Sequence, residues 1–344
     1  MSDQTADQTG EQTTLRASDE PLCRGYDVAL LDLDGVVYIS GKVVPGAREA
    51  LKQAQVQGMR LAYVTNNASR TPAAVAQTLT GMGINAEPSD VVTSAQAAAR
   101  LLAERLPAGA PVLAIGGMGL RVALRERGLR PVSTAAARPA AVVEGFAPQV
   151  DYSALAQGGL AVRAGALFVG TNGDQTIPNA QGIAPGNGSL LQVIATATGQ
   201  TPIIAGKPEP PLHHESVIRT GAKHPLVVGD RLDTDIEAAQ RVGADSLLVL
   251  TGVTDALGAV LAPPHQRPSY IADDLAGLVE TQPAVSSEDG GFGCGGWTAR
   301  WQGDQLDLSG DGRRIDGLRA LCAAAWSRGD VTKDAVEQAV HTLG

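Results

Sequence analysis

Two aspartates stand two residues apart at the end of the first apolar segment, in the sequence YDVALLDLDGV. The run before Asp32 and Asp34 is short and almost continuously apolar, which is typical of a buried strand in a parallel sheet. Residues i and i+2 of a strand point to one face, so the two carboxylates would share one end of the strand. Because like charges that lose hydration repel, the pair indicates a bound cation or a reacting group. The alternative is that one of the two caps or closes a turn.

A second group of acids follows another apolar run, in PLVVGDRLDTDI. Asp230 ends this run, and Asp233 and Asp235 come after it. Open α/β sheets bind ligands at the carboxyl ends of their strands, so acids from the two strands would converge there. Oxygen ligands without a cluster of Cys or His favour Mg²⁺ over zinc. Helix capping by Asp233 or Thr234 is compatible with this interpretation, and it leaves Asp230 unexplained.

Groups suited to a phosphate follow two other segments. Thr65, Asn66 and Asn67 close the second strand candidate, where a hydroxyl, two amides and backbone N–H groups could meet an anion. Lys207, within GKP, offers a compact ammonium group that suits a phosphoryl oxygen or a crowded carboxylate. Taken alone, the first motif would be an ordinary turn and Lys207 a solvated loop lysine.

In chain order, DLDGV, TNN, GKP and GDRLDTDI resemble the four motifs of the haloacid dehalogenase superfamily of phosphohydrolases. The resemblance covers about residues 26–274, and the large insertion between the second and third motifs is similar to the C2-capped, 4-nitrophenyl phosphatase-like branch. With its C-terminal extension, the whole chain most resembles the actinobacterial glycerol 3-phosphate phosphatases. Asp34 belongs to the phosphatase pattern, which disfavours an actual dehalogenase.

The resemblance implies a role for each motif residue. Asp32 would be the nucleophile that forms an aspartyl-phosphate, and Asp34 would be the general acid and base. Asp32, the Asp34 carbonyl oxygen and Asp230 would bind Mg²⁺. Asp235 would support the site by orienting a metal water or Lys207. The residues assigned to the transferring phosphoryl group are Thr65, Asn66, Asn67 and Lys207, of which Thr65 and Lys207 also count as catalytic.

Alternating strand and helix patterns predict an α/β protein with a parallel sheet. We expect a Rossmann-like parallel-sheet core, an inserted α/β cap domain of the C2 type and a small α+β C-terminal extension. The tail from Trp297 contains a hairpin pattern and two helical patterns, and it resembles a fragment of an acetyltransferase fold. The predicted boundaries are a disordered leader at residues 1–24, the catalytic core at 25–106 and 201–281, the cap at 107–200, a linker at 282–293 and the extension at 294–344.

Two glycine-containing motifs lie in the predicted cap. TNGD at residues 171–174 resembles the family's cap motif near the substrate entrance, so Asp174 is a candidate for substrate contact. A role of Asp174 in a turn is the alternative. GGMG at residues 116–119 lacks the spacing of a dinucleotide-binding loop and predicts a tight turn from strand to helix.

Composition narrows the classes of partner. The 344 residues include 27 basic and 36 acidic side chains, and the net charge of −9 opposes attraction to nucleic acid or to anionic membrane. No apolar run approaches about 18 residues, and the opening segment lacks the pattern of a signal peptide. We therefore expect a cytoplasmic protein, and the family resemblance implies that its partner is a small-molecule phosphomonoester. The sequence leaves a homo-oligomer open.

Together with the acidic motifs, the family resemblance implies a Mg²⁺-dependent phosphomonoesterase, with glycerol 3-phosphate as the first candidate substrate. Phosphoglycolate, pyridoxal phosphate and sugar phosphates are alternatives within the same chemistry. Two alternatives belong to other classes: a phosphoester-binding regulatory protein, and a mutase that transfers the phosphoryl group to an acceptor other than water. Intact acids at every motif argue against the regulator.

Overall fold

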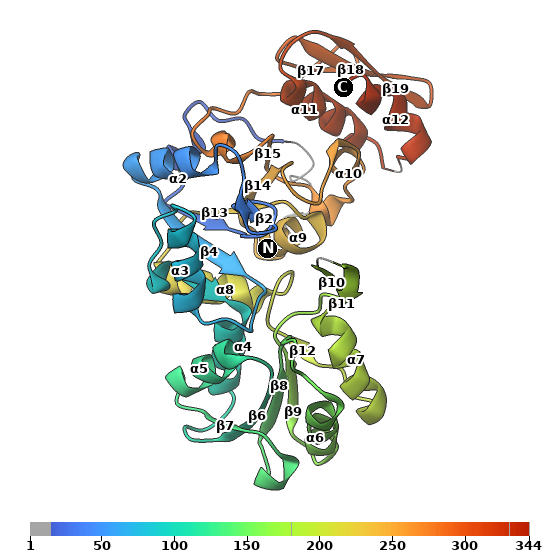
Figure 1. The fold of residues 1–344 in the computed structure, drawn as a ribbon. Helices are drawn as coiled ribbons and strands as arrows, with labels where there is room; N and C mark the ends of the chain where they lie inside the picture. Colours follow the sequence, from blue (N-terminus) through green and yellow to red (C-terminus); the bar gives the residue numbers. More distant parts are fainter. Residues whose placement is uncertain (1–14, 180, 330, 344) are drawn as a thin grey trace, which may run out of the picture. The chain divides into compact units, whose positions relative to one another are not determined.

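The structure is a computed structural model that describes residues 15–179, 181–329 and 331–343. The chain divides into two compact units, of which unit 1 comprises Met1–Arg60 and His224–Gly344 and unit 2 comprises Leu61–Lys223. Figure 1 labels the elements of both units. In the part of the chain that the structure describes, no helix has the length and apolar character needed to cross a membrane.

Unit 1 contains a parallel sheet of β15 (Tyr270–Ala272), β14 (Asp245–Val249), β13 (Pro225–Gly229) and β1 (Val28–Leu31), in that spatial order. The register pairs Leu31 with Val228, so the segments that carry Asp32 and Asp230 leave the sheet at the same edge. Every residue of β1 is buried, which explains its continuous apolar composition. The other elements before the C-terminal extension are α1 (Leu22–Gly25), β2 (Tyr38–Ile39), β3 (Lys42–Val43), α2 (Ala47–Val56), η3 (Leu232–Ile236), α9 (Glu237–Arg241), α10 (Ala256–Val260), η4 (Pro264–Gln266) and η5 (Leu275–Leu278).

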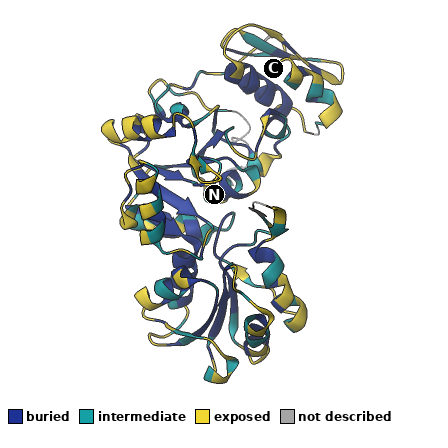
Figure 2. Cartoon of the chain, viewed as in Figure 1, coloured by how far each residue is buried: buried dark blue, intermediate teal, exposed yellow. Residues whose placement is uncertain are grey.

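The C-terminal extension is an antiparallel sheet with two helices and belongs to unit 1. Its elements are β16 (Ser286–Glu288), β17 (Gly291–Cys294), β18 (Trp297–Gln302), β19 (Gln305–Gly310), α11 (Arg314–Trp326) and α12 (Lys333–His341). The pairing of β18 with β19 confirms the predicted hairpin. Helix α11 is buried on all sides, as Figure 2 shows, because it lies between its own sheet and the elements α10 and β15. One apolar cluster joins Ile236 and Leu248 to Leu318, so this small extension does not depend on a core of its own.

The segment at residues 282–293, expected to be a linker, contains β16 and the first residues of β17. The two strands pair across Asp289 and Gly290. Both residues have positive φ angles, as in the type I′ turn that Asp-Gly favours. The Ser, Gly and acidic composition suggested a linker here, whereas the Asp-Gly pair is a hairpin signal.

Part of the expected disordered leader is ordered in the structure. Residues 1–14 lie outside the described residues, but Ser18 forms an antiparallel bridge with Gln282, and Leu22–Gly25 forms α1. Leu22 and Cys23 are buried. The ordered part begins earlier than its polar composition indicates because these two apolar side chains pack into unit 1.

Unit 2 contains two sets of parallel strands. β4 (Arg60–Thr65), whose first residue belongs to unit 1, pairs with β5 (Val91–Thr93). A five-stranded sheet follows the order β12 (Ile203–Ile204), β9 (Leu167–Gly170), β8 (Ala141–Glu144), β6 (Pro111–Ile115) and β7 (Arg130–Val132). Figure 2 shows these strands largely buried beneath partly exposed helices. The other elements are α3 (Pro72–Gly81), η1 (Pro88–Asp90), α4 (Ser94–Ala103), α5 (Met118–Glu126), η2 (Ala135–Ala137), α6 (Tyr152–Arg163), the hairpin of β10 (Thr176–Asn179) and β11 (Gly182–Pro185), α7 (Asn187–Thr198) and α8 (Pro210–Thr220).

The predicted fold class is confirmed: parallel sheets covered by helices, a second α/β sheet within the insertion and a small α+β extension. The exact limits of the cap, at residues 107–200, remain a prediction. The GGMG segment forms the predicted tight turn, because β6 ends at Ile115 and α5 begins at Met118. A Cβ at Gly117 or Gly119 would lie 2.6 or 2.3 Å from a backbone oxygen of the loop at residues 68–70. These glycines therefore let the loop after the TNN motif pack directly against the start of α5.

Candidate active site

Three carboxylates of unit 1 come together beyond the carboxyl ends of β1 and β13. One oxygen from each of Asp32, Asp230 and Asp235 lies within 4.8 Å of the others. Asp230 and Asp235 are each 1% exposed, and Asp32 is half-buried. Three negative charges this close and this shielded from water are unfavourable unless a cation compensates them. The donor set consists of oxygen alone and fits Mg²⁺.

Asp230 lies in a narrow space that glycines provide. A Cβ at Gly252 would be 1.9 Å from Oδ2 of Asp230, and one at Gly35 would be 2.3 Å from the same atom. The backbone N–H of Val253 donates to this oxygen at 2.7 Å. The loops after β1 and β14 can therefore close around the carboxylate only because these two positions carry no side chain. Gly252 and Val253 are site residues that the sequence analysis missed.

Asp235 is positioned by the short π-helical segment η3. A Cβ at Gly229 would lie 2.1 Å from the Asp235 Cβ, and the backbone N–H of Arg231 donates to Oδ2 of Asp235 at 3.2 Å. Asp233 points elsewhere, since its carboxylate pairs with the Arg231 side chain at 2.8 Å and is largely exposed. The structure thus separates the last two of the three acids in the fourth motif, bringing Asp235 to the cluster and leaving Asp233 on the surface.

Asp34 is exposed, and its side chain is not among the three clustered carboxylates. It lies in a tight turn in which the N–H of Gly35 donates to the carbonyl oxygen of Tyr38 at 2.8 Å. Gly35 has a φ of +88°, a conformation that glycine adopts at little cost. An exposed carboxylate next to a buried group of acids is accessible to a substrate. Metal binding through the Asp34 carbonyl oxygen stays a prediction.

The TNN motif of unit 2 forms a compact turn after β4. Thr65 is 5% exposed, and its Oγ1 accepts a hydrogen bond from the backbone N–H of Asn67 at 3.1 Å. The exposed side chain of Asn67 accepts from the backbone N–H of Ser69 at 2.9 Å. In this conformation, the Asn67 side chain organises the loop that follows. The hydroxyl of Thr65 lies at the end of a buried strand.

Lys207 is bound to the same turn. Its backbone N–H donates to Oδ1 of Asn66 at 2.8 Å, and Nδ2 of Asn66 donates to the Lys207 carbonyl oxygen at 3.2 Å. The Lys207 side chain is buried, with Nζ 3.4 Å from the carbonyl oxygen of Val64. A Cβ at Gly206 would lie 2.5 Å from Oδ1 of Asn66, so glycine is required for this approach. The second and third motifs, 141 residues apart, are thereby joined into one group of polar side chains.

The loop that carries Asp174 is bound to the TNN turn as well. Nδ2 of Asn66 lies 3.4 Å from Oδ2 of Asp174, and Nδ2 of Asn172 donates to the Asn66 carbonyl oxygen at 2.9 Å. Oδ1 of Asn172 accepts from the backbone N–H of Asp174 at 3.1 Å. The structure therefore brings Asn66, Lys207 and Asp174 together. Asn172 was not predicted as a site residue, although its place within the TNGD motif was a signal.

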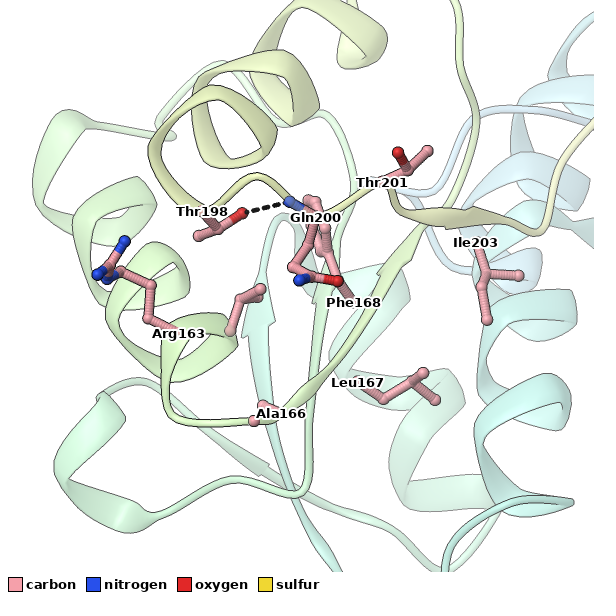
Figure 3. A pocket seen from close by; sticks show the side chains of 10 residues that line it. Arg163, Ala166, Leu167, Phe168, Thr198, Gln200, Thr201 and Ile203 are labelled. Carbon is pink, nitrogen blue, oxygen red and sulfur yellow. Dashed lines mark hydrogen bonds between the residues drawn. The ribbon is translucent and has the colours of Figure 1, made fainter.

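A pocket elsewhere in unit 2 contains none of the predicted site residues. Figure 3 shows it beside the first residues of β9 and β12, with Leu167, Phe168 and Gln200 among its lining. Arg163 is its one charged side chain. TNGD follows the opposite, carboxyl end of β9, so this pocket is separate from the polar group around Asp174.

Family models match both segments that carry the motifs. Residues 29–130 match the model of the haloacid dehalogenase-like hydrolases, and residues 204–278 match a second, related hydrolase model. Residues 294–344 match a GCN5-related N-acetyltransferase-like domain, in agreement with the predicted resemblance of the tail. The two hydrolase matches together cover more than half of the chain. The chain belongs to the haloacid dehalogenase-like hydrolase family.

Individual relatives with high sequence identity to this chain are named phosphatases. The chain is 44% identical over 313 residues to a D-glycerol 3-phosphate phosphatase of Mycobacterium tuberculosis, covering 89% of this chain and 87% of the relative. An acid sugar phosphatase of Staphylococcus aureus is 40% identical over 67% of this chain and 88% of its own length. The crystal structure of the M. tuberculosis glycerol phosphate phosphatase in complex with magnesium superposes with a TM-score of 0.85 and 40% identity, covering 94% of this chain and all of the other. A 4-nitrophenyl phosphatase-type structure from Geobacillus stearothermophilus gives a TM-score of 0.66 at 35% identity, over 74% of this chain and 98% of that one.

Proposed function

We propose that this chain is a Mg²⁺-dependent phosphomonoester hydrolase that converts glycerol 3-phosphate to glycerol and phosphate. The observation that carries the proposal is the cluster of Asp32, Asp230 and Asp235 in a chain so similar to a named glycerol 3-phosphate phosphatase. The M. tuberculosis and S. aureus relatives described above are named phosphatases, and the fold and family of this chain agree with that class of enzyme.

Asp32 is the proposed nucleophile. It is half-buried at the end of β1, where its backbone N–H donates to the carbonyl oxygen of Val228 at 2.8 Å and fixes its position beside the segment of Asp230. A carboxylate oxygen that attacks phosphorus forms an aspartyl-phosphate as the P–O bond to the leaving alkoxide breaks. Water then attacks the same phosphorus and releases phosphate with the Asp32 carboxylate restored.

Asp34 is the proposed general acid and base. Its side chain is exposed, is not one of the three clustered carboxylates, and is proposed to reach a leaving group that approaches from solvent. It gives a proton to the departing alkoxide and then takes one from the attacking water. Both steps need one carboxyl group that changes its protonation between them.

Bound Mg²⁺ would supply positive charge against the nucleophile and the phosphoryl oxygens, which would otherwise repel each other. Asp32, the Asp34 carbonyl oxygen and Asp230 would hold it, with Asp235 in support. Val253 and the two glycines beside Asp230 keep that carboxylate in a single orientation.

Thr65, Asn66, Asn67 and Lys207 are proposed to bind the transferring phosphoryl group. The buried Lys207 provides the positive charge, and Thr65 provides a hydroxyl donor. The hydrogen bonds between Asn66 and the Lys207 backbone favour one arrangement of these donors before substrate binds. Asp174, which is close to Asn66, is proposed to contact the leaving group.

Sugar phosphates are the second candidate substrates, because the S. aureus relative is named an acid sugar phosphatase. Phosphoglycolate and pyridoxal phosphate are further candidate substrates, because they are phosphomonoesters that the same reaction would hydrolyse. We further propose that the enzyme acts in the cytoplasm on small molecules, without a nucleic-acid or membrane partner, which the net charge of −9 supports. A homo-oligomer is compatible with this function.

A phosphate-release screen tests the proposal. The purified chain is assayed with glycerol 3-phosphate, phosphoglycolate, pyridoxal phosphate, several sugar phosphates and 4-nitrophenyl phosphate, with Mg²⁺ and after chelation. The proposal expects Mg²⁺-dependent release and the highest kcat/KM for glycerol 3-phosphate. Another ester with a higher kcat/KM would correct the substrate, whereas no release from any ester would reject the phosphatase. Retention of a labelled phosphoryl group on an organic product would indicate a mutase.

A further inference from the structure

A buried carboxyl group of unit 2 lies outside the predicted catalytic machinery. Glu144 ends β8 and is completely buried. It shares a face of β8 with Val142, which belongs to an apolar cluster with Leu191 and Ile194 of α7. Gly170, its partner in β9, has no side chain that could bind it. Within the described residues, neither carboxyl oxygen of Glu144 has a hydrogen-bond partner.

The side chain of Asn187, at the start of α7, is the polar group next to Glu144 that affects its pKa. Nδ2 of Asn187 donates to the carbonyl oxygen of Asn172 at 2.8 Å. Oδ1 of Asn187 is buried and lacks a donor among the residues that the structure describes. The Asn187 side chain is thus close enough to lower the pKa of Glu144, but within the described residues no hydrogen bond of ordinary length reaches either carboxyl oxygen or Oδ1 of Asn187. Each such acceptor is costly, and a proton on the carboxyl group would give the cluster the donor that it lacks.

From Asn187 a chain of amides leads to the motif residues. Asn187 binds the backbone of Asn172, and the Asn172 side chain binds the Asn66 carbonyl oxygen and the backbone N–H of Asp174. The Asn66 side chain in turn accepts a hydrogen bond from the backbone N–H of Lys207 and donates one to its carbonyl oxygen. A side chain that fixes Asn187 therefore acts on the proposed phosphate-binding and substrate-contacting residues through neutral hydrogen bonds.

We propose that Glu144 is a positioning residue that works as a neutral carboxylic acid, donating its proton to Oδ1 of Asn187 and so holding the Asn187, Asn172 and Asn66 chain in its bound arrangement. For its effect on catalysis, this inference rests on the proposed phosphatase function. The protonated state of Glu144 can be measured without any substrate.

The electrostatics around Glu144 agree with a neutral acid. Burial raises the pKa of its carboxyl group to about 8, and hydrogen bonding with the Asn187 side chain, which lowers the pKa, offsets this only in part. The neighbouring elements β6, β9 and α7 carry no titratable side chain. Tyr152 and Arg163, at the two ends of α6, do not contribute to the shift. At neutral pH the carboxyl group is therefore mostly protonated.

Two substitutions separate the possible roles of Glu144. Glu144→Gln keeps a donor and an acceptor in nearly the same volume, whereas Glu144→Leu keeps only the volume. With phosphatase activity as readout, we expect Glu144→Gln to stay within about twofold of wild type and Glu144→Leu to lose about tenfold in kcat/KM. The loss should be mostly in KM, because the nucleophile and the general acid are untouched.

Two kinetic outcomes would overturn the proposal. Equal damage in both variants would mean that a charged Glu144 is needed. Wild-type kinetics in Glu144→Leu would make the residue a core filler. A second signature is the pH profile: KM of wild type should rise as pH passes about 8, where Glu144 ionises, and KM of Glu144→Gln should not follow that rise.

Measurements without substrate keep the inference testable if Glu144→Leu fails to fold or if the enzyme has another substrate. At pH 6, the infrared carbonyl band of a protonated carboxyl group should be present in wild type and smaller in Glu144→Gln. The pKa of Glu144 in the folded state is about 8, above the ordinary value of 4.5. The contribution of its protonated form to the free energy of unfolding is therefore complete below about pH 4.5 and is lost as the pH rises to about 8. The stability of wild type relative to Glu144→Gln should fall across that window. An unchanged infrared band, or a stability difference that is constant with pH, would show that Glu144 is ionised.

Discussion

The polar groups of the two units are built on opposite principles. In unit 1, one oxygen from each of three carboxylates lies within 4.8 Å of the others, and a bound cation would relieve their mutual repulsion. In unit 2, the side chains of Asn187 and Asn172 donate hydrogen bonds to the backbone carbonyl oxygens of Asn172 and Asn66, respectively. These groups are neutral, and the buried Lys207, whose backbone N–H donates to the Asn66 side chain, adds one positive charge. The first group is poised for an ion, and the second is organised before any ligand arrives.

This difference assigns separate tasks to the two groups. Carboxylates that need a cation should control Mg²⁺ affinity and the chemical steps. Amides that fix Lys207 and Asp174 should control how the phosphoryl group and the rest of the substrate are bound. Substitutions in unit 1 should therefore change kcat and the Mg²⁺ requirement, and substitutions in unit 2 should change KM and the choice of substrate.

The largest effect is expected for Asp32→Asn. An amide cannot form the covalent intermediate, so turnover should fall by roughly 10⁴ or more while the fold is retained. Phosphate release measures the activity, circular dichroism measures the fold, and mass spectrometry excludes deamidation of the new Asn. Asp233→Asn is the matched control, because it removes the same charge from an exposed acid nearby and should leave activity almost unchanged. Near-normal turnover of Asp32→Asn would remove Asp32 from the nucleophile role.

Asp34→Asn should cost about 10²–10⁴ in kcat for glycerol 3-phosphate, because proton transfer to the alkoxide is lost. The loss should be smaller for 4-nitrophenyl phosphate, whose leaving group needs little protonation. Rapid-mixing experiments that detect a burst of the first product show whether formation of the aspartyl-phosphate limits the rate. If it does, equal losses for the two esters would contradict the role of Asp34 in leaving-group departure.

Gly252→Ala tests the support of the metal site. Its new Cβ would lie 1.9 Å from Oδ2 of Asp230, so the carboxylate or the loop after β14 must move. We expect the Mg²⁺ concentration for half-maximal activity to rise by about 10–100-fold, the range seen when groups that orient metal ligands are changed. Gly25→Ala is the control, because its Cβ would have open space around it. An unchanged Mg²⁺ requirement in Gly252→Ala would show that Asp230 is not a ligand.

The carboxylate cluster of unit 1 could be predicted from the sequence because charged residues directly after a continuous apolar segment are unusual and easy to recognise. Asp32 and Asp230 follow strands whose continuous apolar residues are buried in the structure. The glycine at position 252 was missed, since a glycine after a strand reads as an ordinary turn until the neighbouring carboxylate is known. The Asp-Gly turn at residues 289–290 was missed in a similar way, within a segment whose composition resembles a linker.

The hydrogen-bonded residues of unit 2 were predicted only where they belong to a recognised motif. Asn66 and Lys207 belong to recognised motifs, and Asp174 lies in one. Glu144 and Asn187, in contrast, are 43 positions apart and become neighbours only because β8 and α7 both pack against β9. A single Glu at the end of a strand carries no local signal of burial. The three-dimensional environment, not the residue type, makes it a neutral acid.

The smallest effect is expected for Asp174→Ala, which sharpens the division of tasks between the units. Losing one polar contact to the substrate is worth about 0.5–1.5 kcal/mol, or up to roughly tenfold in relative kcat/KM. Discrimination between glycerol 3-phosphate and larger phosphomonoesters should change, and a bulky ester could gain from the added room. The Mg²⁺ requirement should stay as in wild type, since Asp174 is not among the clustered carboxylates. The measurement is kcat/KM for at least three phosphoesters at one Mg²⁺ concentration. Should all three change by the same factor, Asp174 would serve the loop through its bond to Asn66, and selectivity would reside in other residues of unit 2.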